Sequence, residues 1–231
     1  MLMRGWWVSS AAVAAVAIAA SACSGSGSKT PSPTANPEIA AITQKFAAST
    51  FQATYTVSGS GADSGGQMVI YKDGPNRFRF DISTTRNGQP TSVMFIQNNN
   101  TSAWCLNDAA ELVPMLGGQG VCFKSNANDP NNPVGNLSST FADLESANVT
   151  LLSKSTRTIA GREASCYRAT DNITGNVDTR CFASDGAMLY SQTEGPDANT
   201  IEATDVKSTV SATAFDLPYP VKDFPGASST P

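Results

Sequence analysis

The chain has five cysteines, and their thiols are its most reactive side chains. An odd number leaves one thiol that needs a role of its own. Four of them fall into two local sets, Cys105 with Cys122 and Cys166 with Cys181. Four cysteines allow three disulfide connectivities. We favour the two local pairs, because each closes a short loop within one supersecondary unit and would stabilise the fold by about 3 kcal/mol.

A zinc site is the competing interpretation of these four thiols. The chain has no Cys-x-x-Cys motif and no histidine, which disfavours zinc. The polar loop 125–133 carries a single carboxylate and lacks the spacing of a calcium loop. The sequence therefore predicts no metal site and no cofactor.

The fifth cysteine, Cys23, closes an N-terminal leader. Arg4 is followed by an apolar stretch from Val8 to Ala20 and by Ser21-Ala22, a pattern typical of a secretory signal. The stretch is shorter than the roughly 20 residues that span a bilayer. Cysteine directly after small residues resembles the lipobox of bacterial lipoproteins, in which the thiol is acylated. An ordinary signal peptide with an incidental cysteine is the alternative.

The domain boundaries follow from changes in composition. We expect a signal peptide over 1–22, a lipidated Cys23 with a Gly/Ser/Pro tether over 23–36, one domain over 37–225 and a disordered tail over 226–231. The chain carries 15 basic and 19 acidic side chains, a net charge of −4, and has no Lys/Arg cluster. A nucleic-acid partner is therefore not expected. The membrane, reached through acyl chains on Cys23, is the expected partner, and the bacterial cell envelope the expected location.

Catalysis is not indicated by the residues present. Without histidine the chain lacks the commonest general base, and it has no Gly-x-Ser-x-Gly, Ser-x-x-Lys or phosphate-binding glycine loop. The carboxylate pairs Asp143/Glu145 and Glu202/Asp205 are interpreted as solubilising charges, with a carboxylate-only hydrolase as the alternative. We expect no enzymatic activity.

The secondary structure that would position these residues is mainly β. Asn36-Pro37-Glu38 begins a helix of about 12 residues, with Ile39, Ile42 and Phe46 at helical spacing. From Phe51 the apolar period changes to two. Short strands then recur at roughly 10–13-residue spacing, which is typical of a sandwich or barrel. The predicted strands are 51–58, 68–71, 78–82, 91–97, 101–106, 149–152, 166–170, 177–182, 187–193 and 200–208, with helical segments near 109–116 and 137–144 between the two groups.

This order of elements resembles the LolA/LolB-like superfamily, in particular lipoproteins of the LppX/LprG type. The resemblance covers roughly residues 37–224. It rests on the hairpin Ser155–Asp171 with its Gly161 turn, on Asp185-Gly186-Ala187-Met188-Leu189, and on Ala214-Phe215-Asp216-Leu217-Pro218. It implies a strongly curved antiparallel sheet, an unclosed β-barrel, with the N-terminal helix and a helical crossover covering the concave face. It also implies a hydrophobic cavity for the acyl chain of a lipid or lipoglycan.

Alternating apolar residues are the candidate walls of such a cavity. Plain core packing is the competing role for each of them, and an envelope interaction or sensor module with a protein partner is the competing function. The candidates are Phe51, Tyr55, Val57, Met68, Ile70, Phe78, Phe80, Ile82, Met94, Ile96, Trp104 and Met188.

Overall fold

The computed structural model describes residues 37–59, 66–86, 89–107, 120–126, 149–172, 175–195 and 198–222. The leader, Cys23, the tether, the expected helical crossover and the C-terminal tail lie outside these residues. The described elements are α1 (Pro37–Ala48), β1 (Thr50–Gly59), β2 (Gly66–Asp73), β3 (Arg77–Arg86), β4 (Gln89–Asn98), β5 (Thr101–Leu106), β6 (Val121–Asn126), β7 (Val149–Ile159), β8 (Arg162–Asp171), β9 (Val177–Ala183), β10 (Met188–Glu194), β11 (Asn199–Lys207), the 3-10 helix η3 (Ala212–Phe215) and β12 (Val221–Lys222).

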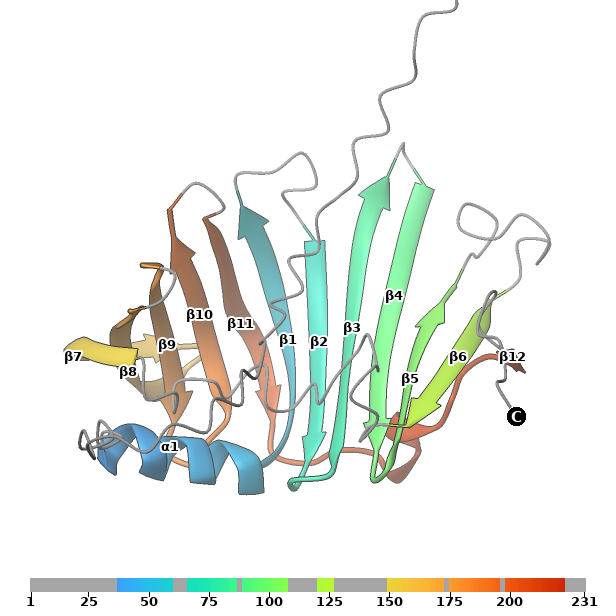
Figure 1. Cartoon of the computed structure of the whole chain (residues 1–231), viewed down its shortest axis with the longest axis horizontal. Helices are drawn as coiled ribbons and strands as arrows, with labels where there is room; N and C mark the ends of the chain where they lie inside the picture. Colours follow the sequence, from blue (N-terminus) through green and yellow to red (C-terminus); the bar gives the residue numbers. More distant parts are fainter. Residues whose placement is uncertain are drawn as a thin grey trace, which may run out of the picture. The chain divides into compact units, whose positions relative to one another are not determined.

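The strands form one curved, unclosed sheet of twelve strands in the order β12-β6-β5-β4-β3-β2-β1-β11-β10-β9-β8-β7 (Figure 1). Two antiparallel meanders, β1–β6 and β7–β11, join where β1 pairs with β11. The two-residue β12 pairs with β6 in parallel, so the sheet is antiparallel except at that edge. The predicted mainly β fold and every predicted strand are confirmed, and β6 and β12 are additional strands.

Helix α1 forms as its residues predict. Pro37 opens the helix, Glu38 lies in the first turn and Lys45 in the last, which suits the helix dipole. Ile39, Ile42 and Phe46 are its buried residues. The Phe46 ring contacts Phe51 and Phe182, with centroids 6.3 and 6.0 Å away. The sheet side that receives α1 is called the helix face below.

A close backbone approach fixes the C-terminal end of α1 against the β9–β10 turn. Gly186 adopts a positive φ of 88°, and a Cβ there would lie 2.5 Å from the Lys45 carbonyl oxygen. Only glycine allows both this conformation and this approach. Across the sheet, the buried Tyr55 hydroxyl donates a 2.6 Å hydrogen bond to the Met188 carbonyl, which links β1 to β10. Burial raises the pKa of Tyr55 far above its ordinary value, so the hydroxyl remains a donor.

The two edges of the sheet differ. β12 is short and follows Pro218 and Pro220, and proline is tolerated at the edge of a sheet. β7 is eleven residues long and pairs with β8 alone among the described strands. Most of its side chains are exposed, and a bulge lies between Leu151 and Ser153. β7 therefore presents a long edge to solvent.

Candidate functional site

Ten of the twelve apolar candidates lie on the helix face, in register with one another. Phe51 is opposite Lys72 in β2, and Tyr55 is opposite Met68. Most of the ten are almost completely buried, and Val57, Ile82 and Trp104 are partly buried. Nine of the ten belong to, or pack against, one core cluster that includes the buried side of α1, whereas Trp104 packs with Leu106, Val121 and Phe123. The strands β3–β6 continue the helix face beyond α1 (Figure 1).

Met94 and Ile96 do not belong with the other candidates. They pair with Asp81 and Arg79, so they project from the opposite face of the sheet. There they pack with Phe215 and the disulfide Cys105–Cys122. The cause is the uniformly apolar run from Val93 to Ile96, in which the period of two is invisible because β4 carries apolar side chains on both of its faces.

Beyond α1, the helix face of β3–β6 is organised in three rows of side chains that run across the strands. The aliphatic row is Ile82, Val93, Leu106 and Val121. The aromatic row is Phe80, Phe95, Trp104 and Phe123. The polar row is Lys72, Phe78, Gln97 and Ser102, beginning on β2. Neighbouring rows are two residues apart along each strand, which is roughly 6.6–6.8 Å.

The aromatic row is a continuous apolar wall. The rings of Phe80 and Phe95 stack with centroids 4.6 Å apart, and those of Trp104 and Phe123 with centroids 5.0 Å apart. Phe95 and Trp104 are direct cross-strand partners in the middle of the row. These two remain only partly buried, whereas Phe80 and Phe123 are 8% and 2% exposed. The centre of the wall therefore keeps accessible aromatic surface.

The polar row ends this wall beside the turns that follow β2 and β4. Lys72 is fully buried, donates a 2.7 Å hydrogen bond to the Gly74 carbonyl and lies 5.0 Å from the centroid of the Phe46 ring. Burial lowers its pKa to about 8, against a smaller opposing effect of Asp73. Gln97 is 5% exposed, and its Oε1 has no hydrogen-bond partner.

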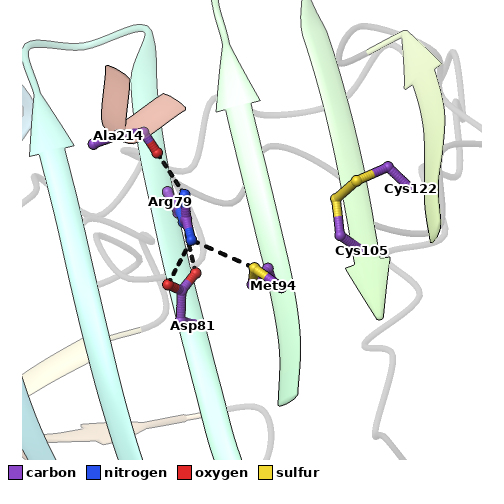
Figure 2. Close-up of a disulfide and its surroundings, with 6 residues drawn as sticks. All are labelled: Arg79, Asp81, Met94, Cys105, Cys122 and Ala214. Carbon is purple, nitrogen blue, oxygen red and sulfur yellow. Dashed lines mark hydrogen bonds and ion pairs between the residues drawn. A yellow bond between two sulfur atoms is a disulfide. The ribbon is translucent and has the colours of Figure 1, made fainter. Parts of the chain in front are cut away.

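The opposite face is closed by the chain's own C-terminal segment (Figure 2). Arg79 binds Asp81 through two hydrogen bonds of 2.7 and 2.8 Å and donates a third, of 2.8 Å, to the Ala214 carbonyl. Arg77 donates to the Ala212 carbonyl and stacks on Phe215, 4.4 Å from the ring centroid. These contacts hold η3 over Met94 and Ile96. A surface groove of about 230 Å³ remains beside Phe215, with Lys124 and Asp216 in its lining.

A second groove, of about 430 Å³, lies on the exposed β7 side of the sheet. Its lining includes the charged pair Glu38 and Lys154 and the side chains of Thr156, Ser165 and Tyr167. Lys154 also lies 5.9 Å from the Tyr167 ring centroid. The groove is polar and lies alongside the open edge strand.

Two disulfides join neighbouring strands. Cys105 is bonded to Cys122 across β5 and β6, and Cys166 to Cys181 across β8 and β9. They are the two local pairs that the spacing favoured. Cys23 lies outside the described residues.

The remaining predictions about chemistry concern metals, carboxylates and membrane crossing. Within the described ranges, no group of three or more Cys, Asp or Glu could hold a metal. Glu202 lies 3.7 Å from Arg157 and Asp205 lies 3.9 Å from Lys207, so each carboxylate has a basic partner. Asp143 and Glu145 lie outside the described residues. No described helix is long and apolar enough to span a bilayer.

Several residues of the three rows did not emerge from the sequence. Phe95 was hidden inside the apolar run of β4, and Leu106 was not distinguished from its neighbours in β5. Val121 and Phe123 belong to β6, which was not predicted as a strand. Only the cysteine pairing could have located β6, because Cys105 opposite Cys122 places Trp104 opposite Phe123. No signal in the sequence marks Gln97 as buried.

No protein-family model and no curated protein matches the sequence. Solved structures match its fold. The MucA/MucB complex of Pseudomonas aeruginosa aligns at a TM-score of 0.50 and 14% identity over 78% of this chain. The alignment covers 60% of the MucB-complex chain, so the present chain spans about three fifths of that length. LprF of Mycobacterium bovis aligns at 0.41 and 11% identity, covering 80% of this chain and 99% of that one.

LppX of Mycobacterium tuberculosis aligns at a TM-score of 0.39 and 10% identity, covering 76% of this chain and 98% of its own. At these identities the comparisons concern the fold. The chain shares its fold with the MucA/MucB complex structure, an unclosed curved sheet with a helix on one face, as its order of elements predicted.

Proposed function

We propose that this protein is a lipoprotein of the bacterial cell envelope, anchored through acyl chains on Cys23, that holds a lipid acyl chain against the three rows of β3–β6. One observation carries the proposal. The aromatic row is a continuous wall whose central members, Phe95 and Trp104, are only partly buried. The matching wall beneath α1 is closed by Ile39, Ile42 and Phe46.

Binding of an acyl chain at such a site does not require a specific polar contact. Each methylene removed from water contributes about 0.8 kcal/mol. An acyl chain that lies across the aliphatic and aromatic rows therefore gains affinity with every methylene that it buries. A stacked aromatic wall of this kind offers a large apolar area with little loss of side-chain freedom. We assign the protein no catalytic role, because the described residues show carboxylates in ion pairs and the chain has no histidine.

Tryptophan fluorescence provides a direct test. The chain has three tryptophans, and two of them, Trp6 and Trp7, precede Cys23. In the protein that begins at residue 24, Trp104 is therefore the sole tryptophan and lies in the proposed site. A diacylglycerol brominated in its acyl chains should quench Trp104 saturably, whereas the same lipid without bromine should not.

Two matched variants distinguish the site from general packing. Phe95→Ala removes a ring beside Trp104, and we expect at least tenfold weaker binding, equivalent to about 1.4 kcal/mol. Phe215→Ala removes the same ring from the opposite face and should leave the affinity within twofold. Absence of saturable quenching, or equal losses in the two variants, would contradict the proposal.

The anchor needs a separate test. The mature protein isolated from membranes should begin at Cys23 and carry the mass of attached acyl chains, and Cys23→Ala should release the domain from the membrane fraction. Two or three chains are needed for firm attachment, since one alone binds reversibly. An unmodified N-terminus upstream or downstream of Cys23 would refute the anchor and leave the lipid site untouched.

A second function, as an envelope interaction module, is favoured by the β7 edge. Among the described strands β7 pairs with β8 alone, and most of its side chains are exposed. An extended segment of a partner could add to such an edge by strand pairing. The MucB structure, which shares the fold, was solved with MucA. Cross-linking from residues introduced in β7, but not from β3, should capture such a partner in the envelope.

A further inference from the structure

The buried polar residues of the described chain gather at one end of the helix face. They are Ser49, Lys72, Gln97 and Ser102. Ser49 follows α1, and the other three belong to the polar row. The rows above them are aromatic and aliphatic. The helix face of β3–β6 therefore has the polarity of an amphiphile, with an apolar length and a polar end.

Three of these four residues have interaction partners. The Ser49 hydroxyl donates to the Phe46 carbonyl at 2.7 Å, and Lys72 donates to the Gly74 carbonyl. Ser102 is also partnered. Gln97 differs, because its Oε1 is buried and accepts no hydrogen bond. A buried amide oxygen without a donor costs free energy, so a residue of this kind calls for a specific explanation.

The position of Gln97 supplies that explanation. It lies on β4 one row from Phe95, between Phe78 and Ser102 on the neighbouring strands. It also lies two residues before the turn at Asn99, at the rim of the sheet. A chain lying along the strands against Val93 and Phe95 would therefore bring its polar end to Gln97.

We infer that the ligand of this site carries a hydroxyl group at its polar end, and that this hydroxyl hydrogen-bonds to the side-chain amide of Gln97. The inference rests on the proposed lipid-binding function. A hydroxyl can donate to Oε1 and so supply the hydrogen bond that this buried oxygen lacks. A carboxylate or phosphate would instead place acceptor oxygens against the unpartnered oxygen. The ligand class is a neutral, hydroxyl-bearing lipid.

The test compares lipids that differ only in this hydroxyl. A brominated diacylglycerol has a free hydroxyl, and its O-methyl ether keeps the chains but loses the donor. A brominated hydroxy-fatty-acid methyl ester carries the hydroxyl on the chain and shows which source the site accepts. Quenching of Trp104 gives the affinity of each. We expect the free diacylglycerol, the hydroxy ester or both to bind about tenfold more tightly than the ether.

Variants assign that preference to Gln97. Gln97→Met has a similar volume and no hydrogen-bonding group, and it should bind the alcohol and the ether equally. Gln67→Met makes the same change at an exposed position of β2 and should keep the preference. Because Gln97 Oε1 has no partner, Gln97→Met should unfold at the same temperature as the parent or higher, which a structural hydrogen bond of Gln97 would not permit.

Each outcome is informative. A hydroxyl preference that survives in Gln97→Met, or a parent protein that binds alcohol and ether equally, overturns the role of Gln97 while leaving lipid binding in place. Failure of every brominated lipid to quench Trp104 overturns the lipid site and the hydroxyl assignment together.

Discussion

The helix face has two halves that are similar in composition but differ in how fully their side chains are buried. Under α1, the Phe46 ring fills the space between Phe51 and Phe182 and is 1% exposed. α1 does not extend over β3–β6 (Figure 1), and on these strands Phe95 and Trp104 form an equally aromatic wall that stays partly accessible. An apolar face becomes core where the chain itself supplies the second layer. On β3–β6, the partly buried rings of Phe95 and Trp104 leave aromatic surface for a ligand.

The largest expected effect tests whether the half under α1 is core. Phe46→Ala removes a fully packed ring and should lower the free energy of unfolding by about 4 kcal/mol. Phe95→Ala removes a ring that is only partly buried, and its cost should be nearer 1–2 kcal/mol. Urea unfolding of both variants at equal m-values provides the measurement. Equal losses would mean that the two halves are packed alike, and the distinction between core and site would disappear.

The disulfides give the next largest effect, because each half of the sheet has one. Replacing both cysteines of either pair by alanine should lower the free energy of unfolding by about 3 kcal/mol, since the sequence separations are similar, 17 and 15 residues. The effect on lipid binding should distinguish the two disulfide variants. Loss of Cys105–Cys122 loosens β5–β6 next to Trp104 and should weaken quenching, whereas loss of Cys166–Cys181 should not. The reverse pattern would place the site in the other half.

The sequence predicts this arrangement well only where the spacing of apolar and polar residues is regular. In β1 and β3 the alternation of apolar and polar residues, from Phe51 to Val57 and from Phe78 to Ile82, predicted both the strands and their faces correctly. In α1 the spacing of Ile39, Ile42 and Phe46 was sufficient for the helix and for its buried side. Local periodicity is decisive wherever one face meets water and the other does not.

The sequence-based predictions failed where the two faces of a strand do not differ in polarity. β4 is covered on one face by η3 and contributes to the aromatic row on the other, so Val93–Ile96 is apolar throughout and its faces cannot be assigned from sequence. β7 shows the opposite case, because both of its faces are largely polar and only its first residues were predicted. The unpartnered state of Gln97 depends on neighbours from two other strands, which no local pattern encodes.

The smallest of the expected effects concerns the polar end of the helix face, where Lys72 lies between the two halves. Burial lowers the pKa of Lys72 to about 8, from an ordinary value of 10.5. Between these values the unfolded chain binds more protons than the folded one, so the free energy of unfolding should rise with pH. From pH 7 to 9.5 this contribution is about 2 kcal/mol.

Lys72→Met should abolish that rise, because methionine has no proton to release. The comparison between parent and variant also cancels the titration of Tyr55 and Tyr71, whose pKa values are raised mainly by burial. Lys124→Met makes the same substitution at an exposed position and should retain the rise. Urea unfolding at half-unit pH intervals measures all three proteins. A parallel pH profile in Lys72→Met would show that the amine is hydrated in solution, and the polar end of the face would then be open to water rather than sealed beside Phe46.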